Sequence, residues 1–213
     1  MRVKVCGITR LEDADVAADL GAFAIGFVFW PKSPRFVDAN RAKSIVRALP
    51  PFVIPVGVFV DQPLDDVNQV ADTVGLGAVQ LHGHETPEYC NGIQRRVIRA
   101  IGLRETMDAG LGDEWPPSVT LLLDAYDPEK RGGTGRAVDW AVAAAVASKR
   151  PTILSGGLRP ENVGAAISTV RPYAIDVSSG VEIRPGVKDP QRLRAFFQAV
   201  SERRAGNGRE ERS

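Results

Sequence analysis

The sequence predicts an α/β fold, a single (β/α)8 TIM barrel. Three observations predict it. Eight short apolar segments rich in β-branched residues recur along the chain, amphipathic segments follow most of them, and 213 residues suit one domain of the barrel type. Strand followed by helix, repeated, is typical of a parallel sheet, and eight strands are what a closed barrel needs.

The predicted strands are spread from the N-terminus to residue 177. Each is a run of mostly Val, Ile, Leu, Ala and Phe, as expected for strands that are buried on both faces. They are Val3–Cys6, Ala24–Phe29, Phe52–Val60, Ala78–Leu81, Val97–Ile101, Val119–Leu123, Pro151–Leu154 and Ala174–Val177.

The predicted helices follow most strands and carry apolar residues at spacings of three and four. The fifth unit is an exception, because Arg104–Pro117 is short, polar and rich in Gly and Pro, so we expect an irregular or truncated helix there. The other helices are expected at Leu11–Leu20, Asn40–Leu49, Pro63–Val74, Val138–Ser148, Pro160–Val170 and Pro190–Val200.

An open doubly wound sheet would show the same alternation, so two further features favour the barrel. No strand is followed by a G-x-G-x-x-G turn with an acidic residue about twenty positions later, the pattern of dinucleotide-binding folds. The last two strands run into the turns Ser155-Gly156-Gly157 and Ser178-Ser179-Gly180. Barrels commonly place a phosphate site in the loops after strands seven and eight, and we expect one here.

Composition narrows the class of partner. The chain is 44% hydrophobic and carries 27 basic and 26 acidic residues, a net charge of +1. This balance favours neither nucleic acid nor a membrane, which leaves a small molecule as the expected ligand. Two cysteines are too few for a disulfide framework or a zinc cluster, and no apolar segment resembles a signal peptide or a membrane span, so we expect a cytoplasmic protein. We expect a monomer.

One catalytic domain is expected over residues 1–200. The remaining segment, 201–213, is mostly charged or small and buries too little apolar surface to offset the entropy of ordering, so we expect a disordered C-terminal tail.

Polar residues at the carboxyl ends of the strands are the candidates for catalysis, because the loops there form the active face of a barrel. Cys6 ends the first strand, and its thiol would act as a general base if its surroundings stabilised the thiolate. Asp124 ends a very apolar strand, where partial burial would raise its pKa and suit it to donate a proton. The alternatives are a buried structural thiol, and an aspartate that caps a turn or pairs with Lys130 or Arg131.

The two glycine-rich turns are candidates for phosphate binding. Backbone N–H groups at Gly156, Gly157, Ser179 and Gly180 would face one phosphate without obstruction, helped by the dipoles of the helices that the turns open. The alternative is that the glycines only end the strands tightly.

Three other strand-end residues are candidates for contacts with the rest of a substrate. Arg35 follows Ser33-Pro34, and its planar fork suits a carboxylate, although position alone fits an exposed surface arginine equally well. Gln80 and His82 are two residues apart, so both should face the barrel mouth. With only His84 nearby, no set of metal ligands is evident, and no metal is expected.

A glycine-rich segment, 131–135, comes soon after Asp124. Its glycines predict a loop that folds over a bound ligand, with a second anion site as the alternative.

Motifs along the chain closely resemble those of the phosphoribosylanthranilate isomerase family. The resemblance runs from Val3 to about Phe197, and its first and last motifs are specific in combination. The motifs are Val3-Lys4-Val5-Cys6-Gly7-Ile8-Thr9, Gly26-Phe27-Val28-Phe29, Ser33-Pro34-Arg35, Val56-Gly57-Val58-Phe59, Val79-Gln80-Leu81-His82-Gly83, Leu122-Leu123-Asp124, Gly132-Gly133-Thr134-Gly135, Asp139-Trp140, Ser155-Gly156-Gly157-Leu158 and Asp176-Val177-Ser178-Ser179-Gly180-Val181-Glu182.

The resemblance implies an Amadori rearrangement in tryptophan biosynthesis without a cofactor, in which N-(5-phosphoribosyl)anthranilate becomes 1-(2-carboxyphenylamino)-1-deoxyribulose 5-phosphate. It implies that Asp124 is the acid that opens the ribose ring and that Cys6 is the base that removes the C2 proton. It also implies that Arg35 binds the substrate carboxylate and that the turns with Gly156, Gly157, Ser179 and Gly180 bind the phosphate.

Three other functions fit the sequence less well. A pentulose-phosphate epimerase typically needs a histidine-rich metal site, which two nearby histidines cannot build. The histidine-pathway isomerases look like duplicated half-barrels with paired aspartates. A non-catalytic binder of phosphorylated metabolites has no need of a proton-transfer pair.

Overall fold

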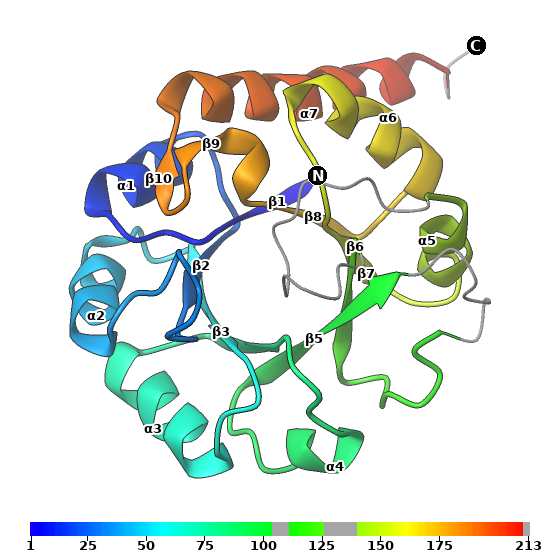
Figure 1. Ribbon diagram of the computed structural model, residues 1–213. Coiled ribbons are helices and arrows are strands. Elements are labelled where there is room, and N and C mark those ends of the chain that lie inside the picture. Colours follow the sequence, from blue (N-terminus) through cyan, green and yellow to red (C-terminus); the bar gives the residue numbers. More distant parts are fainter. Residues whose placement is uncertain (104–110, 126–139, 211–213) are drawn as a thin grey trace.

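The protein is a closed eight-stranded parallel barrel surrounded by helices, seen in Figure 1 along the barrel axis. The computed structural model describes residues 1–103, 111–125 and 140–210. Strand order follows chain order, β1 to β8, and β8 pairs with β1 to close the barrel. This confirms the (β/α)8 barrel that the sequence predicts.

The strands lie where the apolar segments predict them, within a few residues. β4 and β8 have the predicted bounds, while β5 is longer than predicted at both ends. The strands are β1 (Arg2–Cys6), β2 (Ala24–Val28), β3 (Ile54–Phe59), β4 (Ala78–Leu81), β5 (Arg96–Leu103), β6 (Thr120–Ala125), β7 (Thr152–Leu154) and β8 (Ala174–Val177).

The two faces of each strand have different surroundings, because successive side chains point to opposite sides of a sheet. On β1, Val3 and Val5 join the large apolar cluster in which strands and helices pack together. Cys6 instead packs with Val28 and Val58 in a small cluster of its own. Since Lys4 lies two residues before Cys6, the alternation puts both side chains inside the barrel.

Helices form the outer ring, and their buried residues follow the predicted spacing. α6 has the predicted bounds, and α5 is described from Trp140 onward. The helices are α1 (Leu11–Asp19), α2 (Ala39–Ala48), α3 (Leu64–Val74), α4 (Pro87–Cys90), α5 (Trp140–Ala147), α6 (Pro160–Val170) and α7 (Pro190–Glu210). Residues 104–110 of the fifth unit, where a truncated helix was expected, lie outside the described part of the chain.

An insertion between β8 and α7 was not expected from the sequence. It consists of a short 3-10 helix, η1 (Ser179–Val181), and an antiparallel hairpin of β9 (Glu182–Arg184) and β10 (Val187–Lys188). The hairpin turns at Gly186, whose φ of 77° favours glycine. The insertion brings Glu182 and Lys188 next to Cys6, the last residue of β1.

Helix α7 continues to Glu210, past Val200, where the sequence predicts order to end. Hydrogen bonds between residues four apart extend the helix across this point, from Ser201 Oγ to the Phe197 carbonyl (3.0 Å) and from Gln198 to Glu202 (2.8 Å). The helix covers most of the segment 201–213 for which the sequence predicts disorder, and residues 211–213 lie outside the described part. The disordered tail stays a prediction.

No helix within the described residues has the length and apolar character to cross a membrane.

Candidate active site

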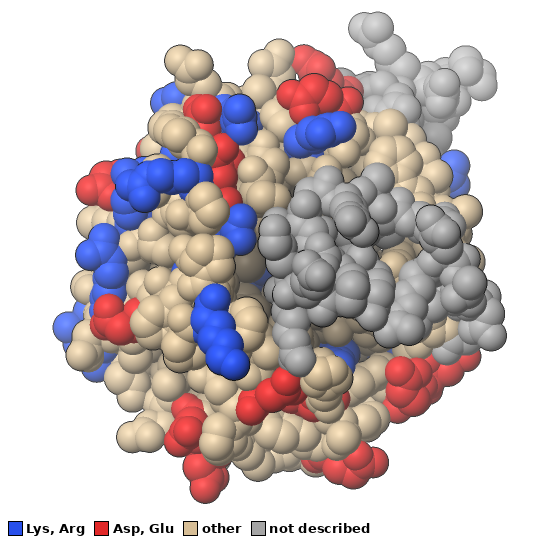
Figure 2. All heavy atoms as spheres, viewed as in Figure 1, with Lys and Arg blue, Asp and Glu red and all other residues tan. Residues whose placement is uncertain are grey.

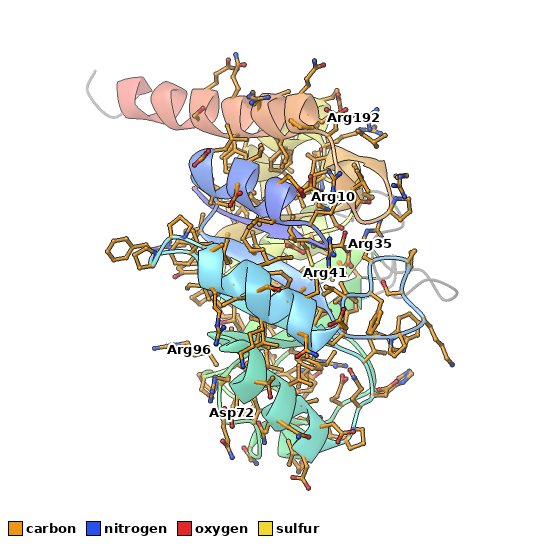
Figure 3. All side chains as sticks on the ribbon, turned by 90° about the vertical axis from the view of Figure 1, so that its left-hand side faces the viewer. Arg10, Arg35, Arg41, Asp72, Arg96 and Arg192 are labelled. Carbon is orange, nitrogen blue, oxygen red and sulfur yellow. The ribbon has the colours of Figure 1, made fainter. Side chains whose placement is uncertain are left out.

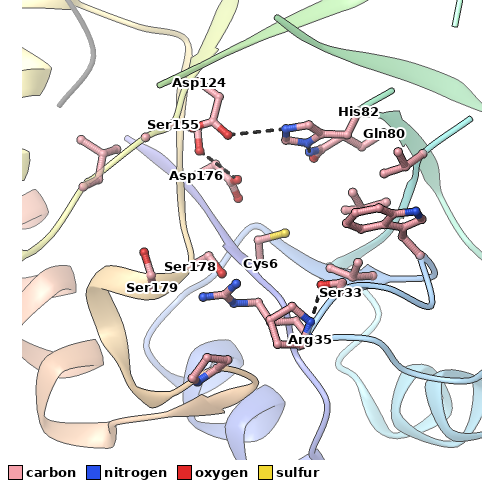
Figure 4. Close-up of a pocket in the computed structure, with 18 of the residues that line it drawn as sticks. Cys6, Ser33, Arg35, Gln80, His82, Asp124, Ser155, Asp176, Ser178 and Ser179 are labelled. Atoms are coloured by element: carbon pink, nitrogen blue, oxygen red, sulfur yellow. Dashed lines mark hydrogen bonds and ion pairs between the residues drawn. The ribbon is translucent and has the colours of Figure 1, made fainter. Parts of the chain in front are cut away.

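A cavity of about 360 Å³ opens at the carboxyl ends of the strands. All the site residues that the sequence predicts line it except Gly180, which lines an adjoining hollow with Gly157 and Ser179. Figure 4 shows their side chains converging, with Cys6 near the middle. The barrel thus brings together residues that lie as far apart in the chain as Cys6 and Ser179.

Cys6 is held where its sulfur faces the cavity while most of the side chain is buried. Gly26 on the neighbouring strand makes room for it, because a Cβ there would clash with the Cys6 sulfur. The chain then turns away at Gly7, whose φ is 76°, and the N–H groups of Gly7 and Ile8 both donate to the Gly26 carbonyl at 3.0 Å. Burial raises the pKa of the Cys6 thiol, and the nearby Lys4 charge opposes this rise.

Asp124 and His82 face each other across the cavity. The Asp124 Oδ2 lies 3.5 Å from His82 Nε2, and His82 Nδ1 lies 3.1 Å from the side-chain nitrogen of Gln80. Because that amide nitrogen donates, Nδ1 accepts, and the imidazole proton is placed on Nε2, toward Asp124. Gln80, His82 and Asp124 therefore form one chain of polar contacts.

Arg35 contacts a buried carboxylate of the protein itself. Its Nε lies 3.0 Å from Glu182 Oε1, and its Nη2 lies 2.7 Å from Glu182 Oε2. One edge of the guanidinium is thus occupied, and the edge formed by Nη1 and Nη2 is the one left for a ligand. The sequence predicted Arg35 as a carboxylate-binding residue, but gave no sign of this partner.

Lys188 connects Glu182 to the end of β1. Its fully buried ammonium donates to the Cys6 carbonyl (2.6 Å), the Ser178 carbonyl (3.3 Å) and Glu182 Oε1 (2.8 Å). Burial lowers the pKa of Lys188 more than Glu182 raises it. For Glu182, burial raises the pKa, but hydrogen bonds from Arg35 and the Lys188 charge together lower it below the usual value.

The two glycine-rich turns lie against each other on one side of the cavity. After β7, Gly156 and Gly157 adopt φ values of 88° and 64°, which favour glycine, and α6 begins at Pro160. After β8, the turn enters η1 rather than a long helix, contrary to the expectation that it opens the last helix. Gly180 packs on the Leu158 carbonyl so closely that any side chain would clash.

Several basic residues lie at this end of the barrel. In Figure 2, Lys and Arg side chains lie mostly on the left half of the face, interspersed with Asp and Glu, and further Asp and Glu side chains lie along its lower edge. The side view in Figure 3 places Arg10, Arg35, Arg41 and Arg192 toward the loop end of the barrel, and Arg96 toward the other end. This distribution favours an anionic ligand at the cavity mouth.

Residues 3–199 match the family model described as N-(5'phosphoribosyl)anthranilate (PRA) isomerase. The chain belongs to this family. The isomerase of Pelobacter propionicus is 48% identical over 209 residues, which cover 98% of this chain and all of the relative. The phosphoribosyl anthranilate isomerase structure from Thermus thermophilus is 43% identical, with a TM-score of 0.87, and covers 95% of this chain and 99% of its own.

A third relative in the family is a structure of the isomerase in complex with reduced 1-(o-carboxyphenylamino)-1-deoxyribulose 5-phosphate. It is 42% identical to this chain, with a TM-score of 0.84, and covers 95% of this chain and 99% of its own. Its ligand carries an aromatic carboxylate at one end and a phosphate at the other. These are the two anionic groups for which the sequence predicted binding residues.

Several polar residues that line or border the cavity were not among the predicted site residues of this family member. Asp176 and Ser155 line it, Lys4 pairs with Asp176, and Glu182 contacts both Arg35 and Lys188. A signal for Lys4 was present, since a lysine between Val3 and Val5 shares the side of the strand that carries Cys6.

The expected lid, 131–135, lies outside the described residues. Within the described part, no three His, Cys, Asp or Glu side chains are grouped to hold a metal ion.

Proposed function

We propose that this protein catalyses the Amadori rearrangement of N-(5-phosphoribosyl)anthranilate to 1-(2-carboxyphenylamino)-1-deoxyribulose 5-phosphate, as a step of L-tryptophan biosynthesis. The observation that carries the proposal is the placement of a thiol, Cys6, and a carboxyl group, Asp124, in one cavity beside a glycine-rich pair of turns. Membership of the isomerase family supports it.

Asp124 is the general acid of the proposed reaction. Its proton goes to the ribose ring oxygen, the bond between that oxygen and C1 breaks, and the amine nitrogen lone pair forms a protonated Schiff base with C1. Asp124 is 4% exposed and lines the cavity, where a positioned acid protonates a bound substrate directly. His82, whose Nε2 points to it, holds the carboxyl group toward the cavity.

Cys6 is the general base. Its thiolate removes the proton from C2, the electrons of that C–H bond form the C1–C2 double bond, and the Schiff base nitrogen is neutralised. The resulting enolamine then tautomerises to the 2-ketone. Protons only move between atoms, so the reaction is balanced without an oxidant, a reductant or a cofactor.

The two anionic ends of the substrate bind in the same cavity as these groups. The Nη1–Nη2 edge of Arg35 takes the anthranilate carboxylate by two parallel hydrogen bonds. Backbone N–H groups of Gly156, Gly157, Ser179 and Gly180 take the phosphate. Binding both ends fixes C1 and C2 between the acid and the base, which lowers the entropy cost of each proton transfer.

Activity of two variants tests the proposal. The unstable substrate is generated in the assay from phosphoribosyl pyrophosphate and anthranilate, and the loss of anthranilate-type fluorescence is followed. We expect both Cys6→Ala and Asp124→Asn to lose at least about 10²-fold in kcat, the usual scale for removing a general acid or base. Undiminished turnover in both variants would refute these roles.

Growth of a tryptophan auxotroph that lacks the isomerase provides a second test. The wild-type gene should restore growth and the Asp124→Asn gene should not, provided that both proteins accumulate equally. A protein that only binds phosphorylated metabolites would fail in both cases.

We further propose that the protein acts as a monomer in the cytoplasm. A reducing compartment suits a base that must remain a free thiol, and both cysteines are free. Among the described residues, Phe52 is the most exposed of the large apolar side chains, at 90%, and it lies at the end of the barrel away from the cavity, so an interface there would cover it. Sedimentation equilibrium tests this, since a dimer mass that falls to the monomer mass in Phe52→Ser would contradict it.

A further inference from the structure

A buried ion pair lies on the floor of the cavity, directly beneath Cys6. Lys4 Nζ on β1 is 2.9 Å from Asp176 Oδ1 on β8, and the two side chains are 3% and 6% exposed. Lys4 and Asp176 are register partners across the seam where β1 and β8 close the barrel. Ser155 Oγ donates a hydrogen bond to the other Asp176 oxygen at 3.4 Å.

The rest of the barrel interior at and below this level is mostly apolar. One small cluster there contains Ala24, Val56 and Ala78, and another contains Leu122 and Ile153. Removing two charges from water costs free energy that their attraction often does not repay, so apolar residues of similar volume would stabilise the barrel as well. The stability of the fold therefore does not account for this pair.

Lys4 and Cys6 are two residues apart on one strand, so their side chains share the inner face of the barrel. The positive charge of Lys4 near the thiol lowers the pKa of Cys6. Asp176 lines the same cavity as Cys6 and has the opposite effect on the thiolate. Cys6 thus lies near the Lys4 ammonium, and the counter-ion of that ammonium, Asp176, lies on the neighbouring strand β8.

Other charged or titratable groups face Cys6, but the structure shows partners for them. The Lys188 ammonium contacts Glu182 and two carbonyls, one of them the Cys6 carbonyl, and Glu182 also binds Arg35. Lys188 lowers the pKa of Cys6 less than Lys4 does. Among the described residues, the charged and titratable groups around the thiol are Lys4 on β1, Asp176 on β8, Lys188 on β10, Glu182 on β9, Arg35 after β2, His82 after β4 and Asp124 on β6.

We propose that Lys4 is the positioning residue that makes Cys6 a base, and that Asp176 sets how strongly it does so. The ammonium stabilises the thiolate that removes the C2 proton, and Asp176 holds the ammonium in place while partly neutralising it. The inference rests on the proposed function, because it assigns the origin of the base that the rearrangement uses.

The proposal predicts shifts of opposite sign for the two partners. Lys4→Met removes the cation and leaves Asp176, so the pKa of Cys6 should rise by at least about one unit, a tenfold loss of thiolate near neutral pH. Asp176→Asn keeps the cation and removes its counter-ion, so the pKa of Cys6 should fall. If the pair had a purely structural role, both variants would melt at a lower temperature, and the pKa of Cys6 would not shift in opposite directions in the two.

Alkylation of Cys6 measures the shift without relying on turnover. The rate of reaction with iodoacetamide is followed from pH 5 to 10, with mass spectrometry separating Cys6 from Cys90. We expect the midpoint of the rate profile to move up in Lys4→Met, down in Asp176→Asn, and not at all in Lys43→Met, which removes the same charge from helix α2 outside the cavity. The pH profile of kcat/KM should move in the same directions.

The outcomes separate this inference from the function on which it rests. An unchanged midpoint in Lys4→Met overturns the role of Lys4, even if Cys6→Ala is inactive. If Lys4→Met does not fold, Asp176→Asn alone decides, because a midpoint that stays or rises there also overturns the proposal. If Cys6→Ala retains full turnover, the proposed mechanism fails, whatever the alkylation profiles show.

Discussion

At the scale of single residues, the proposed acid, Asp124, depends on the tautomer of its neighbour His82. His82 presents its Nε2 proton to Asp124 because its Nδ1 accepts from Gln80. Outer partners of this kind fix the orientation of the groups that they touch, and their loss typically reduces activity by 10- to 100-fold in metal sites, a reasonable scale here. Gln80 is 2% exposed, so water does not readily take its place.

We therefore predict that Gln80→Leu lowers kcat by about tenfold and changes KM little, since the substrate ends bind elsewhere. Gln80→Glu is the matched variant, because glutamate has the same size as glutamine but its carboxylate can only accept. The imidazole proton then lies on Nδ1, and Nε2 faces Asp124 as an acceptor. It should be less active than Gln80→Leu. Steady-state kinetics of the three proteins checks this order, and a reversed order would refute the role of the tautomer.

Arg35 is expected to recognise the aromatic carboxylate with the edge that Glu182 leaves open. Lysine cannot supply two parallel donors while also contacting Glu182. Arg35→Lys should weaken binding of a reduced product analogue by about tenfold or more, the scale of a hydrogen bond to a charged group.

The same analogue without its ring carboxylate provides the control for Arg35. Calorimetric titration should show that this compound binds the wild type and Arg35→Lys with nearly equal affinity. An equal loss of affinity for both compounds would mean that Arg35 acts on the shape of the cavity rather than on the carboxylate.

At the scale of elements, the phosphate turns depend on close contact between the loop after β7 and η1. Gly180→Ala places a methyl group against the Leu158 carbonyl, so the two turns must separate. We expect KM for the substrate to rise about tenfold or more, as when hydrogen bonds to a charged group are lost, and stability to fall. Gly164→Ala is the control, since its Cβ meets nothing in helix α6 and alanine should stabilise the helix by up to about 1 kcal/mol. Similar kinetics in the two variants would contradict the role of this contact.

Much of the barrel is predictable because each strand and helix has its own local pattern. The strands are continuous apolar runs, and helix α6 has both a proline at its start and the expected spacing. The hairpin of β9 and β10 is not predictable in this way, because its three- and two-residue strands are too short to show a period. Its register depends on contacts with distant residues such as Cys6 and Arg35.

The position of a site residue is predictable where the residue ends a strand, as for Cys6 and Asp124, which both line the cavity. Glu182 and Lys188 lie on the hairpin, so nothing in their local sequence indicates that they reach Arg35 and Cys6. Lys4 and Asp176 become partners only through the pairing of the first strand with the last. Long-range pairing of this kind has no local signal in a single sequence.

At the scale of the whole molecule, stability in acid should depend on the buried carboxylate of Glu182. Its folded-state pKa is lowered, so its contribution is complete above its unfolded pKa, about 4.3, and is lost as the pH falls through the lower folded value. Glu182→Gln should cost about 3 kcal/mol at pH 7, the scale for breaking a buried ion pair, and less at pH 3.

Urea unfolding of the two proteins at both pH values measures this difference. The wild type should lose more stability between pH 7 and pH 3 than Glu182→Gln does, because only the wild type has this carboxylate to protonate. Equal losses would show that other carboxylates govern unfolding in acid.

The closure of the barrel also decides when the catalytic centre comes into being. The bonds from Lys4 to Asp176 and from Lys188 to Cys6 join residues 172 and 182 positions apart. While the ribosome is still synthesising the chain, the segment that carries Cys6 emerges first and has to wait for the final unit. A nascent chain that ends before β8 has Cys6 and Lys4, but it has neither Asp176, the partner of Lys4, nor the second phosphate turn. Catalytic competence is thus a property of the finished polypeptide, and no shorter product of interrupted translation should release a reactive intermediate.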